Sequence, residues 1–189
     1  MEVRKLPPPA KILLWDKRLR EKPCDPVVNF DAELILLAKV LESTCYQYNG
    51  CGLAAPQIGD FRRVALVHYP ADTQPFVMVN PVIDEINSKG EQIDNESCLS
   101  LPGAHASGEI CRNTAKVRRC RDIVYSYQDL TGARQEATAS GMLARIICHE
   151  TDHCAGWFFT DRIGDCSRAI VMRQYQNFVR HMEESSVAS

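Results

Sequence analysis

The sequence predicts a single α+β domain over residues 1–189, in which short mixed or antiparallel sheets pack around a central helix and a further helix forms the C-terminal segment. Three observations lead to this prediction. Strand patterns gather in the first 140 residues without alternating with helices. An apolar stripe at helical spacing then lies between Ser140, a suitable N-cap, and Gly156, a suitable stop, and an amphipathic stretch runs from about Ser167 to Glu184.

The part of the chain before the central helix begins with a helix and continues as strands. Apolar residues at helical spacing, from Leu34 to Cys45, predict a helix over about residues 31–48, and Gly50 stands where a helix cap is expected. Extended segments are predicted at residues 63–68, 76–80, 82–86, 114–119, 123–128 and 133–138. Residues 129–132, Asp-Leu-Thr-Gly, predict a hairpin turn between the last two strands.

The central helix contains the most informative motif of the chain, H-E-x-x-H at residues 149–153. Residues four apart share one helix face, so His149 and His153 can direct ring nitrogens at a single cation. Glu150 points to the side of that face, where it can hold a water without binding the metal. The motif therefore indicates a metal site with its own base. A surface helix that carries two histidines by chance is the alternative.

A catalytic metal site usually has three protein ligands and one open position, so a third ligand is required. Downstream, Phe159 occupies the place where a metzincin has its third histidine, and the acidic candidates near the end of the chain are Glu183 and Glu184. Upstream, Cys98 is flanked by an acid and a hydroxyl in a segment bounded by turn formers. Cys98 is therefore the best third ligand.

Three separated segments make the sequence similar to the peptide deformylases. The first family motif, G-x-G-x-A-A-x-Q-x-G, appears at residues 50–59. The second, E-G-C-L-S, appears at residues 96–100 with Ser97 in place of the glycine, and the third, in which glutamine precedes H-E, begins at Cys148 in place of that glutamine. Residues 16–20 and Gly156-x-Phe158 also look like the family. The resemblance covers about residues 10–165.

The resemblance implies that the chain removes the formyl group from the N-terminal formyl-methionine of new polypeptides. It implies one divalent metal ion, with ferrous iron as the native metal and zinc, nickel or cobalt as substitutes, although ligand chemistry alone does not choose among them. Cys98, His149 and His153 would hold the ion and acidify a water. Glu150 would take the proton of that water and return it to the departing amine.

The resemblance also implies how the rest of the site works. The side-chain amide of Gln57 and the backbone N–H of Leu99 would stabilise the negative charge on the formyl oxygen. Residues expected to contact the substrate are Cys51, Gly52, Ser97 and Ile146. Gly52 would lie at an edge that receives the peptide as an added strand, Ser97 would change the wall beside the ligand cysteine, and Ile146 would line a methionine pocket, with a place in the core as the alternative.

Composition limits the partners and the compartment. The net charge of −2 predicts no partnership with nucleic acid or acidic membranes, and no stretch is apolar enough to span a bilayer or form a secretory signal. Nine cysteines without a C-x-x-C pair predict reduced thiols in an intracellular, reducing compartment. The resemblance to the deformylases implies that this compartment is the bacterial cytoplasm or an organelle of bacterial ancestry such as the mitochondrion, because formyl-methionine is made there. Cys148 and Cys154 are expected to be buried thiols and not ligands.

Two other functions stay open at this stage. One is a zinc endopeptidase that uses the same helix, and the absence of a further ligand downstream argues against it. The other is a catalytically weakened protein that binds a metal or formyl-peptides, suggested by Ser97 and Cys148. The arginines of the terminal helix, Arg168, Arg173 and Arg180, are typical of a solvated face, with docking at the ribosome as the alternative. The sequence predicts no oligomeric state.

Overall fold

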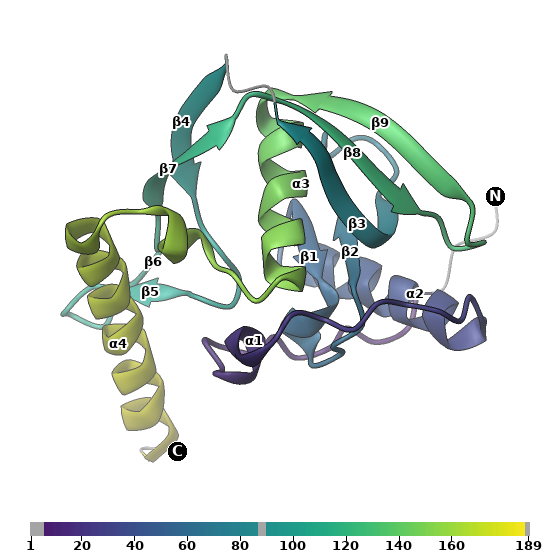
Figure 1. The fold of residues 1–189 in the computed structure, drawn as a ribbon. Coiled ribbons are helices and arrows are strands. Elements are labelled where there is room, and N and C mark those ends of the chain that lie inside the picture. The colour runs from purple at the N-terminus through teal and green to yellow at the C-terminus, as the bar shows by residue number, and fades with distance from the viewer. Residues whose placement is uncertain (1–5, 87–89, 188–189) are drawn as a thin grey trace. The chain divides into compact units, whose positions relative to one another are not determined.

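The computed structural model describes residues 6–86 and 90–187, and its elements follow the α+β order that the sequence predicts (Figure 1). Contacts gather into two compact units. The first comprises residues 1–92 and 119–157, and the second comprises residues 93–118 and 158–189. The α+β class is confirmed, and a single functional domain over residues 1–189 stays a prediction.

The first unit is built on a five-stranded antiparallel sheet with the order β1-β2-β3-β8-β9. Its strands are β1 (Gly52–Ala54), β2 (Val64–Val67), β3 (Phe76–Ile86), β8 (Asp122–Gln128) and β9 (Arg134–Ser140). Helix α3 (Gly141–Cys154) packs against this sheet through a core that includes Ala65, Met78 and Ile147 (Figure 1). Strand β1 lies at one end of the strand order, so it is an edge strand.

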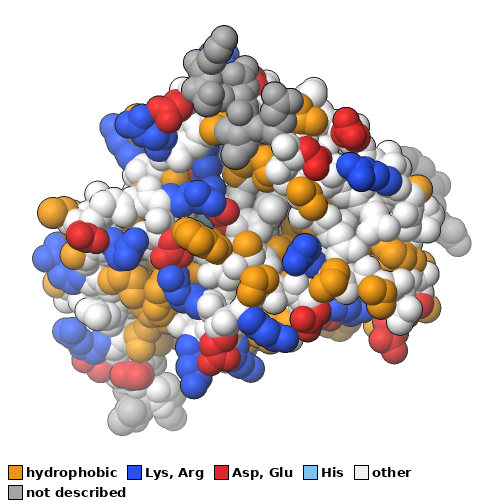
Figure 2. Space-filling view, viewed as in Figure 1, with side chains coloured by type: hydrophobic (Ala, Val, Ile, Leu, Met, Phe, Trp, Pro, Cys, Tyr) orange, Lys and Arg blue, Asp and Glu red, His pale blue; other side chains and the backbone are white. Residues whose placement is uncertain are grey.

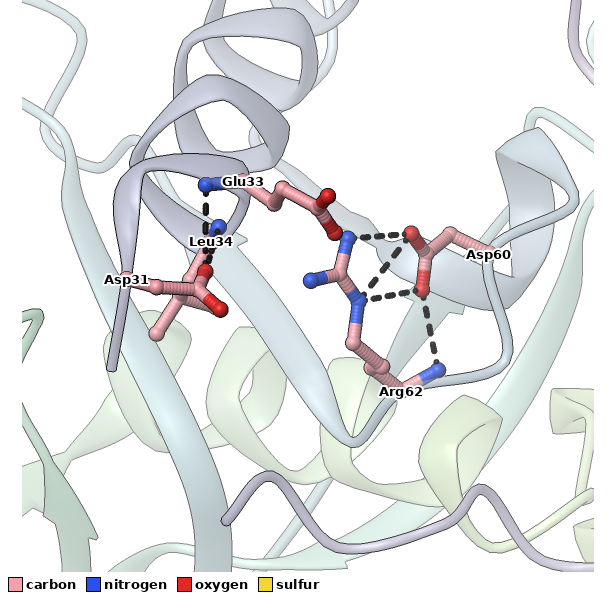
Figure 3. A network of polar contacts seen from close by, with 5 residues as sticks. All are labelled: Asp31, Glu33, Leu34, Asp60 and Arg62. Carbon is pink, nitrogen blue, oxygen red and sulfur yellow. Dashed lines mark hydrogen bonds and ion pairs between the residues drawn. The ribbon is translucent and has the colours of Figure 1, made fainter. Parts of the chain in front are cut away.

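Helices α1 (Arg18–Glu21) and α2 (Ala32–Gln47) complete the first unit, with the short 3-10 turn η1 (Ala55–Ile58). Asp31 caps α2, because its carboxylate accepts hydrogen bonds from the backbone N–H groups of Glu33 and Leu34 (Figure 3). The predicted helix is confirmed. At its C-terminal end, however, Asn49 and not Gly50 takes the left-handed conformation, with φ of 51°, and the N–H of Gly50 donates to the carbonyl of Cys45.

The prediction of two strands at residues 76–80 and 82–86 is wrong, because these residues form the single continuous strand β3. Asn80 sits between them with a φ of 53°, and the pairing with β8 shifts between Val79 and Val82. The side chain of Asn80 accepts from the N–H of Val27 and donates to its carbonyl and to Gln128. These bonds hold the bulge in place, so Pro81 bends the strand and does not end it.

The remaining strand predictions of the first unit are confirmed within one or two residues. Gly156, with φ of 81°, follows α3 as the expected stop, but Ser140 occupies the N-cap position of α3 without making a side-chain capping bond. Strand β1 has no counterpart among the predicted elements, since three residues give no periodic signal.

The second unit contains short strands and the C-terminal helix. Strand β4 (Glu91–Glu96) pairs with β7 (Ala115–Cys120), and β5 (Gly103–Ala104) pairs with β6 (Ile110–Cys111). The turn η2 (Phe159–Arg162) leads into α4 (Asp165–Val187), which packs on β5. Asn113 ties these parts together, because its side-chain amide donates to the carbonyls of Pro102 and Val171.

Charged side chains of both signs are interspersed on the face drawn in Figure 2. In the part of the chain that the structure describes, no helix combines the length and the apolar character needed to cross a bilayer.

Candidate active site

Helix α3 brings His149 and His153 together, as the four-residue spacing predicts. Both rings are buried, their Nε2 atoms are 3.1 Å apart and their planes are nearly perpendicular. Two imidazole nitrogens that converge in a buried place form half of a tetrahedral metal site, because each presents a lone pair to the same point in its neutral form. This geometry fits a divalent ion bound by Nε2 of both residues.

Glu150 lies beside this pair and against the edge strand of the sheet. Its side chain is buried, and a Cβ atom added to Gly52 would lie 2.5 Å from Oε1 of Glu150. Any larger residue at position 52 would therefore collide with the glutamate. The sequence analysis expects Gly52 at an edge that receives the substrate peptide, and the structure shows that the Glu150 carboxylate also approaches this backbone closely from within the chain.

Gln57 is held in one orientation by the backbone of the same motif. Its Oε1 accepts a hydrogen bond of 2.9 Å from the N–H of Ala54, and the side chain is buried. Because the amide oxygen is engaged as an acceptor, the orientation leaves the NH₂ group as the part of the side chain that donates elsewhere. This polarity is the one that an oxyanion donor requires.

The turn after Gln57 is fixed by an ion pair outside the motif. Gly59 takes a left-handed conformation with φ of 86°, and the backbone N–H of Asp60 donates to the carbonyl of Ala55. Figure 3 shows the Asp60 carboxylate facing the guanidinium of Arg62, with 2.6 Å between Oδ2 and an Nη atom. The Asp60 side chain raises the pKa of Arg62. The first motif therefore ends in a turn that a backbone hydrogen bond closes, and the Asp60–Arg62 ion pair follows directly after it.

Cys98 lies in the second unit, in a turn that follows β4. The N–H of Leu101 donates to the carbonyl of Cys98 at 3.0 Å, and the thiol is buried, as are the side chains of Glu96 and Ser100. Ser97 is exposed and Leu99 is half-buried. The turn therefore buries the predicted ligand, whereas Ser97, the departure from the family motif, faces outward.

The remaining predicted site residues belong to the first unit. Ile146 is buried in the core cluster with Ala54, Met78 and Tyr125, which supports its place in the core. Cys51 is exposed immediately before β1. Cys148, expected to be buried, is only half-buried, and it packs against the same core cluster.

Sequence reasoning did not single out one ionic contact next to the ligands. Arg119 at the end of β7 donates to Oδ2 of Asp152 on α3 at 2.5 Å, and the two side chains are only 4% and 12% exposed. Both residues belong to the first unit, so the pair fastens α3 to the short segment that leads into β8. Asp152 lies inside the H-E-x-x-H motif, yet nothing in its neighbourhood in the sequence identifies Arg119 as its partner.

Comparisons with known proteins show which family the chain belongs to. Residues 9–169 match the family model described as polypeptide deformylase. The chain is 38% identical to the peptide deformylase of Dictyoglomus thermophilum over 136 residues, 72% of this chain and 80% of the relative. It is also 38% identical to peptide deformylase 1 of Bacillus anthracis over 153 residues, 81% of this chain and 91% of the relative.

Solved structures give the same result. The crystal structure of a peptide deformylase from Legionella pneumophila matches with a TM-score of 0.82 and 34% identity, covering 93% of this chain and 98% of that one. The peptide deformylase from Synechococcus elongatus in complex with actinonin matches with a TM-score of 0.75 and 31% identity, covering 93% and 88%.

The fold, the buried histidine pair and these matches define a metal-dependent hydrolase that acts on an N-formyl amide. The chain belongs to the peptide deformylase family, whose function is the removal of the formyl group from N-formyl-methionine peptides. The predicted function is thereby confirmed, and no finding supports the endopeptidase or the weakened binding protein.

Proposed function

We propose that this chain carries out deformylation with one divalent metal ion bound by Cys98, His149 and His153. The observation that carries the proposal is the convergence of the two buried Nε2 atoms beside the Glu150 carboxylate. The two histidines offer imidazole nitrogens and Cys98 offers a thiolate, which are ligand types that such an ion takes. A thiolate with two imidazoles leaves one position of a tetrahedral site for water or substrate.

When bound, the ion would supply Lewis acidity, which would lower the pKa of a water and polarise the formyl group. Glu150 takes the proton of the attacking water on its carboxylate and delivers it to the amine nitrogen as the C–N bond breaks. Burial of Glu150 against Gly52 keeps the carboxylate in one place for both transfers. Formate and a free α-amine are the products.

Gln57 and Leu99 are proposed to stabilise the transition state. The Gln57 amide is preset by the Ala54 N–H, so its NH₂ group can donate to the formyl oxygen as negative charge develops there. The backbone N–H of Leu99 would be the second donor. Gly52 lies on edge strand β1, which supports binding of the substrate peptide as an added strand. Cys51 and Ser97 complete the proposed substrate contacts, whereas Ile146 packs in the core cluster.

Ferrous iron is the proposed native metal, and zinc, nickel and cobalt are proposed substitutes, because a thiolate and imidazole site accepts all of them. The substrates are formylated nascent polypeptides. Docking at the ribosome through Arg168, Arg173 and Arg180 on α4 belongs to this proposal, as does an intracellular, reducing location in a bacterial cytoplasm or an organelle of bacterial ancestry, which the bacterial relatives support.

A formate-release assay on formyl-Met-Ala-Ser, run without oxygen on protein loaded with iron, nickel or zinc, tests the proposal. Glu150→Gln is expected to lower turnover by about 10²–10⁴-fold while the metal content stays unchanged, because the metal ligands remain and the proton carrier is lost. Glu183→Gln, on the exposed part of α4, is the matched control and should keep full turnover. Full activity in Glu150→Gln would contradict the assigned role.

A further inference from the structure

The first unit contains a cavity of about 430 Å³ between helix α2 and the tip of the hairpin that joins β8 to β9. We call it the α2 cavity. Leu66 of β2 and Val77 of β3, which pair with each other in the sheet, are among its lining residues. A cavity of this volume is large enough for a small organic molecule.

The α2 cavity lies on the face of the sheet that α3 does not cover. Ala65, Val67 and Met78 pack in the core cluster with residues of α3. Because successive side chains of a strand point to opposite faces of the sheet, Leu66 and Val77 face away from that helix. The sheet therefore separates the α2 cavity from the residues that α3 contributes to the candidate active site.

One wall of the α2 cavity is a single side of the helix. Ile35, Ala38, Lys39 and Glu42 all line it, and their spacing of three, four and seven residues places them on one side of α2. Ala38 and Glu42 are buried, whereas Ile35 and Lys39 are exposed. The ammonium group of this wall is therefore in water, and its carboxylate is enclosed.

The opposite wall is the tip of the hairpin, which hydrogen bonds hold in one conformation. The carboxylate of Asp129, a lining residue, accepts hydrogen bonds from the backbone N–H groups of Thr131 and Ala133. The side-chain amide of Gln128 donates to the carbonyl of Gly132. The cavity thus has a fixed negative charge on this side, and its shape does not depend on a ligand.

The charges of the lining residues favour a cation. Glu42 and Asp129 contribute two carboxylates, and Lys39 contributes one ammonium group. Only 9% of Glu42 is exposed, and its Oε1 accepts a long hydrogen bond of 3.4 Å from the Tyr46 hydroxyl. An enclosed carboxylate is stabilised most by a positively charged hydrogen-bond donor. The aliphatic side chain of Leu66 suits the hydrocarbon part of such a molecule.

We propose that the α2 cavity binds a small organic amine. The ammonium group of the amine pairs with the Glu42 carboxylate, and its apolar body lies against Leu66 and Val77. An alcohol with the same body lacks the charge for this pair, and a carboxylate with the same body is repelled by Glu42 and Asp129. This site takes no part in the proposed deformylation.

The test titrates phenethylamine in its ammonium form into the isotope-labelled, zinc-loaded enzyme and follows the backbone amide signals by NMR. We expect the signals of Leu66 and Val77 to shift, with a dissociation constant in the millimolar range that is usual for so small a ligand. Phenethyl alcohol and hydrocinnamate have the same phenethyl body with a neutral and an anionic head group. Both should bind at least about tenfold more weakly than the amine.

Three variants locate the binding of the amine. Glu42→Gln should remove the preference for the amine over the alcohol. Lys39→Gln should strengthen binding of the amine by about twofold to fivefold, because it removes a competing positive charge, and it keeps the test decisive if Glu42→Gln is poorly folded. Glu33→Gln is the matched control on the same helix. Figure 3 shows the Glu33 side chain extending toward Arg62, so this variant should bind the amine as the parent does.

The proposal is overturned if hydrocinnamate binds as tightly as phenethylamine, or if phenethylamine causes no shift at Leu66 and Val77 in the millimolar range. It is also overturned if a folded Glu42→Gln protein keeps the full preference for the amine, or if Lys39→Gln weakens binding. Because the readouts are amide signals of the first unit, they do not depend on the activity of the enzyme.

Discussion

Helices α2 and α3 both belong to the first unit and both contact strands β1 and β2, but they bury different chemistry. The buried side chains of α2 are mainly apolar, with Leu34 and Leu41 fully enclosed. Helix α3 buries five residues with carboxylate, guanidinium or imidazole side chains, namely Arg145, His149, Glu150, Asp152 and His153. Burying such groups costs stability unless they are paired or bind a metal. The comparison indicates that α2 stabilises the fold and α3 is retained for its chemistry.

Removing a ligand from α3 gives the largest expected effect. His153→Ala should lose the metal and with it the deformylase activity, because a single imidazole and a thiolate cannot hold the ion at the usual three-ligand site. Metal content by mass spectrometry and formate release measure both quantities. An active, metal-loaded His153→Ala protein would contradict the assignment of the metal chemistry to α3. Loss of both metal content and formate release would support it.

The ion pair on α3 gives the next effect. Arg119→Met should lower the free energy of unfolding by about 3–5 kcal/mol, because it leaves the buried Asp152 carboxylate without its guanidinium. Urea unfolding at pH 7 measures the change. The double variant Arg119→Met with Asp152→Leu is the control and should recover part of the loss. A single variant as stable as the parent would show that Asp152 is satisfied by other groups.

A core substitution on α2 should act on stability alone. Leu41→Ala removes a fully buried side chain and is expected to cost about 2–5 kcal/mol of unfolding free energy. Turnover per folded molecule, measured well below the melting temperature, should stay at the parent value. Leu36→Ala, at an exposed position of the same helix, is the matched control with little effect on either quantity. Reduced turnover per folded molecule in Leu41→Ala would contradict the assignment of α2 to stability alone.

The smallest expected effect concerns pH and a thiol on α2. Burial, followed by the negative charge of Glu150, raises the pKa of Cys45 from its usual 9.0 to about 12. A raised folded pKa means that the contribution of Cys45 to stability is complete below pH 9 and is lost as the pH rises toward 12. Stability should therefore fall less steeply above pH 9 in Cys45→Ala than in the parent, as urea titrations would show.

Alkylation provides the matching control for this thiol. At pH 9 iodoacetamide should modify the exposed Cys51 and spare Cys45 in the folded protein. Equal labelling of the two cysteines would contradict the burial of Cys45.

The sequence predicts the long periodic elements and the central motif because their signals are local. Spacing of four residues is enough to unite His149 and His153, and the hairpin between β8 and β9 follows from a turn at residues 129–132. Strand β4 gives no such signal, since its sequence, Glu-Gln-Ile-Asp-Asn-Glu, has no apolar alternation. Strands β5 and β6 are two residues each and exist only through pairing with each other.

The missed features of the site depend on residues that are distant along the chain. The pairing of Arg119 with Asp152 is set by tertiary packing, which no local pattern encodes. The sequence also predicts that one strand ends at Asn80 and another begins after it, although the structure has one continuous strand there. The Asn80 side chain replaces the missing ladder bonds by binding Val27, a residue that lies in a different segment.

X-ray absorption at the edge of the bound metal, on an active preparation kept free of oxygen, tests the central claim most directly. The claim is that a thiolate from one segment and two imidazoles from α3 bind one divalent ion. The spectrum should contain one sulfur scatterer at about 2.3 Å and two imidazole nitrogens at about 2.0–2.1 Å if the site is loaded with zinc. An active preparation whose metal has no sulfur neighbour would contradict the account.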